Sequence, residues 1–123
     1  GHLDSWDLGT GAIDDGAGLA ITMGAGAIIG RCEKAPLRTI RVIAWANEEQ
    51  GLYGAKAYAQ AHGKGKALAR HQLGAESDFG AGRVYALRGK VAAEAEPVLA
   101  EIAGVLAPLG IVHEPGLGGP GPD

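Results

Sequence analysis

The sequence predicts an α/β fold with a partial mixed sheet flanked by helices. Residues 39–46, TIRVIAWA, are almost wholly apolar and rich in β-branched side chains. This pattern is typical of a central strand that is covered on both faces. Segments with helical character lie on either side of it in the chain. Strands that alternate with helices in this way indicate an α/β sheet.

Two helices are expected around this strand. Residues 16–30 predict the first, although Gly24 and Gly26 inside it each cost about 1 kcal/mol relative to alanine. Residues 55–62 predict the second, which Gly63 closes. Residues 1–15 are expected to form a strand end and a long polar loop.

The second half of the chain continues the alternation. Residues 71–77 predict a strand that leads into Asp78, and residues 84–87 predict a short third strand. Residues 92–106 predict an amphipathic helix, with Pro97 tolerated near its first turn. Its expected core face consists of Val98, Leu99, Ile102, Val105 and Leu106. The glycine-rich residues 116–123 predict a loop.

Length and charge restrict the function. The chain has 123 residues, enough for one domain spanning residues 1–123. Its net charge of −3 argues against a nucleic-acid partner, which requires a basic surface. No apolar run approaches the roughly 20 residues that span a bilayer, so no membrane partner is expected. Cys32 is the one cysteine, which excludes an internal disulfide.

Acidic residues gather where strands are expected to end. The three groups are His2, Asp4, Asp7, Asp14 and Asp15; Glu48 and Glu49; and Glu76 and Asp78. Ligands of open α/β sheets bind beyond the carboxyl ends of strands, so these groups can meet in one cleft. Converging carboxylates repel one another unless a cation lies among them, and histidine with carboxylates suits Zn²⁺. Helix capping is the alternative explanation for each acidic pair.

Three motifs resemble a known family. GHLDSWDLGTGAIDDGAG and NEEQGLYGA, followed by ESD, resemble the co-catalytic zinc aminopeptidases of metallopeptidase family twenty-eight. The HxD and DDG motifs are twelve residues apart (14 − 2), as in that family. The text from ESDFGAGR to VYALRG looks most like its carboxypeptidase Q-like, plasma glutamate carboxypeptidase-like branch. The resemblance implies a zinc-exopeptidase-like core, of the phosphorylase/hydrolase-like type.

The resemblance also implies metal ligands. His2 and Asp78 would be terminal ligands of the first metal, Asp14 would bridge both metals, and Glu49 would bind the second. Two nearby metals need one short carboxylate between them. The resemblance further implies a cis peptide bond between Asp14 and Asp15.

Two supporting roles follow from the same resemblance. Glu48 would be the general base that takes a proton from the attacking water. Asp4 would orient the imidazole of His2, because metal-bound imidazoles usually need such a partner.

The family site contains one more histidine, well downstream, and an apolar strand before GHLDS. The resemblance therefore predicts a truncated catalytic domain, with two Zn²⁺ in the complete family site and one or none here. His113, expected in an exposed turn, is a poor substitute ligand. His62, at a helix end, and His71, before a strand, are also poor candidates.

The expected function is hydrolysis of a peptide or dipeptide by a metallo-exopeptidase, as an aminopeptidase, carboxypeptidase or dipeptidase. A truncated, inactive metal-binding remnant is the alternative, and a related amidase or cyclase is a third. The resemblance implies a secreted or periplasmic location. Substrate preference and oligomeric state stay open.

Overall fold

The computed structural model describes residues 1–78, 82–114 and 118. The chain divides into two compact units, Gly1–Ala81 and Gly82–Asp123. The first unit contains the helices α1 (Gly16–Gly30), α2 (Tyr53–His62) and α3 (Gly65–Leu68). The second contains β1 (Ala86–Arg88), the 3₁₀ turn η1 (Ala93–Ala95), α4 (Glu96–Leu106), the 3₁₀ turn η2 (Ala107–Leu109) and β2 (Val112–Glu114). Apart from Gly118, the expected terminal loop lies outside the described residues.

Helix α1 has the predicted bounds, so the expectation for residues 16–30 is confirmed. Asp15 occupies the N-cap position, but its side chain makes no capping hydrogen bond. At the other end, the Arg31 N–H donates to the Ile28 carbonyl at 3.1 Å. Asp15 therefore directs its carboxylate elsewhere, which matters for the site.

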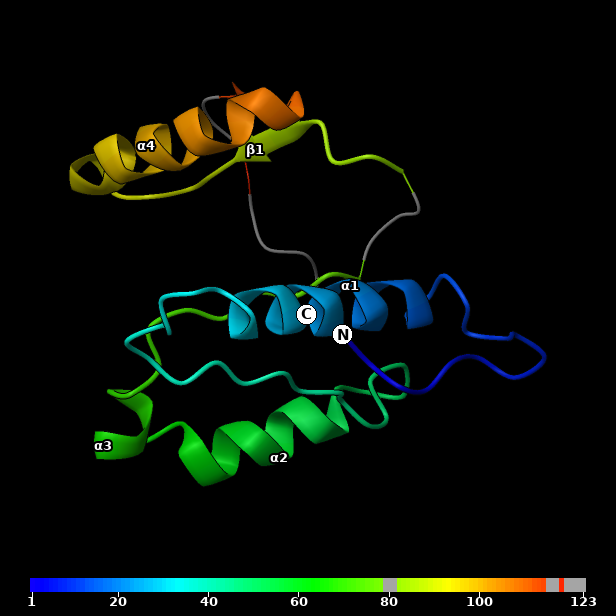
Figure 1. Ribbon diagram of the computed structural model, residues 1–123. Coiled ribbons are helices and arrows are strands. Elements are labelled where there is room, and N and C mark those ends of the chain that lie inside the picture. Colours follow the sequence, from blue (N-terminus) through cyan, green and yellow to red (C-terminus); the bar gives the residue numbers. More distant parts are fainter. Residues whose placement is uncertain (79–81, 115–117, 119–123) are drawn as a thin grey trace. The chain divides into compact units, whose positions relative to one another are not determined.

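Residues 39–46 run as an extended segment between α1 and α2 (Figure 1). The prediction of a strand here is wrong by hydrogen-bonding pattern, because the segment makes one isolated parallel bridge, between His2 and Trp45. The Leu3 N–H donates to the Trp45 carbonyl (2.9 Å), and the Trp45 N–H donates to the Gly1 carbonyl (3.0 Å). A central strand needs ladder partners on both sides. Within the described residues, only residues 1–3 supply one.

The strand predicted at residues 71–77 is also wrong, since the segment has no regular structure. A β-rich sequence forms a strand only where a neighbour accepts its hydrogen bonds. The described chain provides no such ladder for these residues. The segment nonetheless carries Asp78 to the site described below.

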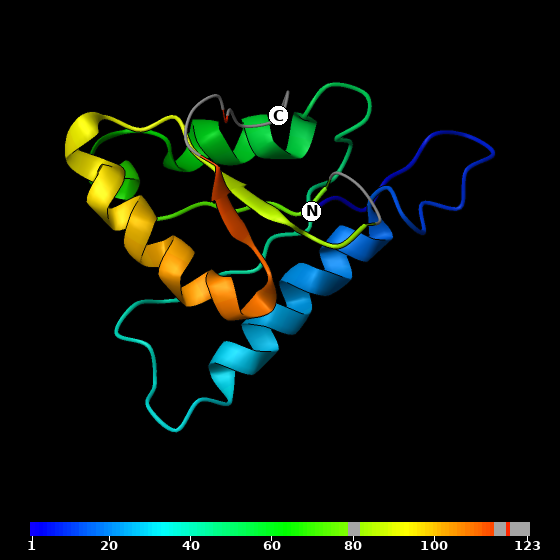
Figure 2. The ribbon, with the colours of Figure 1, turned by 90° about the horizontal axis from the view of Figure 1, so that it is seen from above.

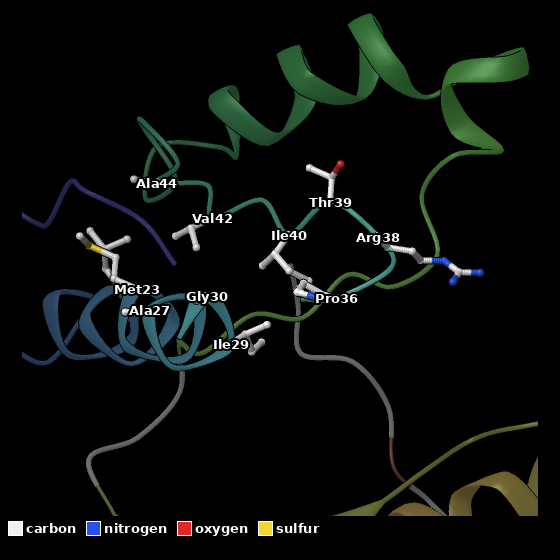
Figure 3. A pocket seen from close by; sticks show the side chains of 12 residues that line it. Met23, Ala27, Ile29, Gly30, Pro36, Arg38, Thr39, Ile40, Val42 and Ala44 are labelled. Carbon is white, nitrogen blue, oxygen red and sulfur yellow. The ribbon is translucent and has the colours of Figure 1, made fainter. Parts of the chain in front are cut away.

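An apolar cavity of about 730 Å³ lies between α1 and the extended segment. Figure 3 shows Met23, Ala27 and Ile29 of α1 on one side and Ile40 and Val42 on the other. None of the acidic residues of the three groups lines it. The cavity therefore belongs to the apolar packing of the first unit and is separate from the polar site.

A tight turn connects the extended segment to α2. The carbonyl of Glu48 accepts hydrogen bonds from the N–H groups of Gly51 and Leu52, both at 2.8 Å. The Gly54 N–H donates to the Ala46 carbonyl at 2.9 Å, and a Cβ at Gly54 would lie 2.8 Å from that oxygen. Helix α2 therefore starts at residue 53, two residues before the predicted start, and ends at the predicted Gly63 cap.

The second unit is built on a parallel strand pair. Ala86, Leu87 and Arg88 of β1 pair with Val112, His113 and Glu114 of β2. Figure 2 shows α4 alongside this pair. The exposed turn predicted around His113 is wrong, because the residue is half-buried within β2. The third predicted strand, 84–87, is shifted to Ala86–Arg88.

The predicted helix 92–106 is present as η1 followed by α4, with Pro97 in the first turn as expected. Its expected core face is only partly correct. Leu99 and Leu106 are half-buried, whereas Val98, Ile102 and Val105 are exposed. The two-stranded sheet offers too narrow a surface to cover a full helix face.

Burial in the described chain is concentrated on polar groups. No apolar side chain among these residues is fully buried, whereas His2 and Asp15 are each 1% exposed. No helix among them is long and apolar enough to cross a membrane. The most protected point of the structure is thus a polar centre in the first unit.

Substitution of Gly18 would test how tightly α1 is packed against this centre. A Cβ at Gly18 would overlap the Ser77 carbonyl and the Asp15 carboxylate, whereas a Cβ at Gly24 would meet nothing within 4 Å. We expect Gly18→Ala to lower the free energy of unfolding by about 1–3 kcal/mol, as overpacking does. The matched Gly24→Ala should raise it by up to about 1 kcal/mol through helix propensity. Urea denaturation followed by circular dichroism measures both, and equal effects would contradict the close approach.

Candidate metal centre

The imidazole of His2 is the meeting point of three chain segments. Its Nε2 atom lies 3.1 Å from Asp14 Oδ1 and 3.2 Å from Asp78 Oδ1. Glu48 Oε2 is 3.6 Å away. The polar loop, the turn before α2 and the end of the 71–78 segment thus converge, as the three acidic groups were expected to do.

The other polar atoms of His2 are held by Asp4 and Asp15. The Nδ1 atom faces the Asp4 carbonyl oxygen at 2.9 Å, and the His2 N–H donates to Asp15 Oδ2 at 2.8 Å. A carbonyl can only accept, so Nδ1 carries the proton in the neutral ring. The lone pair of Nε2 then points at carboxylate oxygens, an arrangement that calls for a proton or a cation between them.

The structure places Asp4 differently from the expected imidazole partner. Its carboxylate Oδ1 is 3.7 Å from His2 Nδ1, farther than the carbonyl of the same residue. The carboxylate instead accepts the N–H groups of Glu48 (2.9 Å) and Glu49 (3.2 Å). Burial favours its neutral form, but these amide donors outweigh that effect and lower the pKa of Asp4.

Glu48 and Glu49 direct their side chains to different tasks. The Glu48 carboxylate approaches His2 and is 15% exposed. Glu49 Oε1 is buried and has no hydrogen-bond partner among the described residues. A buried carboxylate oxygen without a donor is costly, so its environment is suited to a cation.

Two sets of potential ligand atoms share His2. His2, Asp14 and Glu49 form one set, and His2, Asp15 and Asp78 form the other, with the ligand atoms of each set within 4.8 Å of one another. One imidazole nitrogen with several carboxylate oxygens is a donor set that fits Zn²⁺. The residues of this chain therefore fit the metal that the sequence resemblance implies.

Asp15 is a residue of the centre to which the sequence assigns no role of its own. It is as deeply buried as His2 and binds the His2 backbone, while sequence reasoning placed it only beside the expected bridging residue. The DD doublet was the available signal, but it does not say which carboxylate turns inward. The Asp14–Asp15 peptide bond is cis, as the resemblance implied.

Capping does not explain the acidic pairs. The Asp15 side chain makes no cap hydrogen bond to α1. The N-cap of α2 is Leu52, three residues after Glu49, so neither glutamate caps that helix. Helix capping is therefore not supported as the explanation for these pairs.

His71 and His62 lie in a separate aromatic cluster. His71 Nε2 is 2.8 Å from the Tyr58 hydroxyl, and its Nδ1 is 2.9 Å from the Ala67 carbonyl. The His62 ring lies 4.5 Å from the Tyr58 ring, centroid to centroid. Both histidines therefore have local packing roles, and neither belongs to the ligand sets described above.

A cavity of about 310 Å³ opens beside the centre. Asp14 and Glu49 form part of its wall, and Trp6 and Ile13 of the polar loop contribute apolar surface. A group bound there would lie against two of the candidate metal ligands.

The electrostatics of His2 give a pH test. Burial disfavours its charged form, but the Asp4 carbonyl and nearby carboxylates, Asp78 foremost, outweigh this and raise the pKa of His2 above 6.5. In the metal-free chain, protonated His2 therefore stabilises the fold below pH 6.5, and this contribution is lost as pH rises through the raised pKa.

We expect the imidazole Hε1 resonance of His2, assigned with His2→Gln, to titrate above 6.5 in NMR spectra. Added zinc should abolish the titration, because metal and proton compete for Nε2. A midpoint at or below 6.5 without metal would contradict the electrostatic account.

Comparison with known proteins gives consistent matches. The model of Peptidase family M28 matches residues 1–114. Carboxypeptidase Q of Xenopus laevis is 38% identical over 111 residues, 90% of this chain and 23% of that protein. Carboxypeptidase Q of Homo sapiens is 39% identical over 113 residues, 92% of this chain and 24% of that protein.

A solved structure agrees with these relatives. The crystal structure of a Peptidase M28 precursor from Shewanella amazonensis SB2B matches with a TM-score of 0.86 and 46% identity. The match covers 98% of this chain and 27% of the chain in that crystal structure. The predicted α/β, zinc-exopeptidase-like fold class is thereby confirmed. The chain spans about a quarter of the length of the relatives it matches.

Proposed function

The chain belongs to peptidase family M28, and from this premise we propose that it supplies the metal centre and general base of a zinc exopeptidase. The observation that carries the proposal is the convergence of carboxylates from three segments on one buried imidazole. Peptides or dipeptides are the proposed substrates. All 123 residues would form part of a single catalytic domain.

In this proposal, His2, Asp14 and Asp78 bind one zinc ion, and Asp14 and Glu49 contribute to a second. The short distances from His2 Nε2 to Asp14 and Asp78 support the first group. The buried Glu49 Oε1 and its place in a ligand set with Asp14 support the second. In this proposal, Asp14 is the ligand that both ions would share.

Glu48 is the proposed general base. Bound zinc would polarise the scissile carbonyl and lower the pKa of an attacking water. The Glu48 carboxylate reaches the same centre as the ligands, within 3.6 Å of His2 Nε2, and stays outside both ligand sets. It can therefore accept the proton of the water and deliver it to the leaving amine.

The cavity beside Asp14 and Glu49 is the proposed position of the substrate. Its mixed wall suits a peptide end, with Trp6 and Ile13 against apolar atoms and the acidic residues near the reacting bond. A secreted or periplasmic location is proposed on the sequence resemblance. Choice between amino-, carboxy- and dipeptidase activity depends on groups that recognise the peptide termini.

The proposed roles of Glu48 and Glu49 can be distinguished by mutation. We expect Glu48→Gln to keep zinc and to lower kcat by at least about 100-fold, the usual contribution of a general base. Glu49→Gln should instead lower the zinc content, because it removes a charged ligand. Zinc analysis and hydrolysis of a dipeptide series measure both effects, with the exposed Glu33→Gln as control. Near-normal turnover by Glu48→Gln would show that another group is the base.

Metal removal tests the centre as a whole. We expect chelation to abolish peptide hydrolysis and stoichiometric Zn²⁺ to restore it, since Glu48 would depend on bound zinc to lower the pKa of the water that it deprotonates. Binding of zinc without any peptide hydrolysis would favour the non-catalytic alternative. Full activity after verified metal removal would contradict the metallopeptidase proposal.

A further inference from the structure

We propose that Asp4 is a positioning residue whose carboxylate holds Glu48 and Glu49 at the metal centre through their backbone N–H groups. The role rests on the proposed function, because it matters for catalysis only if these glutamates act there. It differs from orientation of the imidazole, the role that the sequence resemblance assigns to this residue.

The contact is bidentate. Asp4 Oδ1 accepts the Glu48 N–H at 2.9 Å, and Asp4 Oδ2 accepts the Glu49 N–H at 3.2 Å. One carboxylate therefore binds two successive amides, each bond strengthened by its charge. The partners are 44 and 45 residues apart, so the contact ties the polar loop to the turn before α2.

The imidazole does not need this carboxylate. His2 Nδ1 already has a close acceptor in the Asp4 carbonyl at 2.9 Å, and the carboxylate oxygen is 3.7 Å away. A side-chain substitution at position 4 leaves a carbonyl in place. The two functions of Asp4 are thus carried by different atoms and can be separated.

The turn is also held by backbone hydrogen bonds of its own. The Glu48 carbonyl accepts the Gly51 and Leu52 N–H groups, and Asn47 has a left-handed backbone with φ of 57°. Left-handed conformations of non-glycine residues persist only where surrounding contacts determine them. Asp4 supplies such contacts immediately after Asn47, and so sets the direction in which both glutamates leave the backbone.

Amide hydrogen exchange by NMR on the zinc-loaded chain tests the proposal directly. Asp4→Ala should accelerate exchange of both the Glu48 and Glu49 amides by at least about tenfold, as expected for loss of a charged acceptor. Asp4→Asn keeps one acceptor oxygen and should affect one amide more than the other. The control is Asp7→Asn, since exposed Asp7 accepts the N–H of its neighbour Leu8 (2.9 Å) and its substitution should leave both amides unchanged.

The imidazole resonances decide between the two roles of Asp4. Unchanged His2 ring ¹⁵N shifts with faster Glu48 and Glu49 exchange support the proposal. Unchanged amide exchange with altered ring shifts would overturn it. Circular dichroism of each variant confirms that the fold is retained, and Asp4→Asn, nearly isosteric, serves if Asp4→Ala unfolds.

Catalysis and metal binding give a second readout. We expect Asp4→Asn to lower kcat about tenfold with little change in KM, and to weaken zinc binding less than Glu49→Gln does. A rise in KM with unchanged kcat would overturn the positioning role. Absence of turnover in the unmutated chain would count against the proposed peptidase function, whereas the exchange data would still decide whether Asp4 holds the turn.

Discussion

The arrangement of the first unit depends on the electrostatic interaction between the His2 imidazole and the carboxylates around it. Its Nε2 faces carboxylates from three segments, while the Asp4 carbonyl and the Asp15 carboxylate hold its other polar atoms. Such a cluster of like charges is stable only around a positive charge. The loop, the turn and the 71–78 segment therefore meet at the imidazole that their carboxylates face. The pKa shifts of His2 and Asp4 reflect that arrangement.

The distribution of burial supports this view. Globular domains usually protect a group of large apolar side chains, yet His2 and Asp15 are the large side chains most protected in the described residues. Apolar groups of α1 and of the extended segment border a cavity instead. For residues 1–78, a cation would therefore add to stability as well as to chemistry, because ligand binding to the folded state stabilises it.

Local features of this fold could be predicted from sequence. The bounds of α1 and the end of α2 at Gly63 could be predicted, because the sequence signals that favour or end a helix act over a few residues. The strand predicted at residues 39–46 is an extended segment instead, because a strand depends on partners far away in the chain. The motifs predicted that His2 and the acidic groups form the site. They could not show that Asp4 uses its carbonyl for the imidazole and its carboxylate for the turn, since both choices have the same sequence.

The contact between Asp4 and the Glu48–Glu49 amides has a consequence for the order of folding. Closing a loop of 44 residues carries an entropy penalty that grows with the logarithm of its length. Helices α1 and α2 form from neighbouring residues and on a shorter timescale. We therefore expect the turn and the polar loop to join late, after the helices exist. The chemical site would then be among the last parts of the first unit to mature and among the first to open.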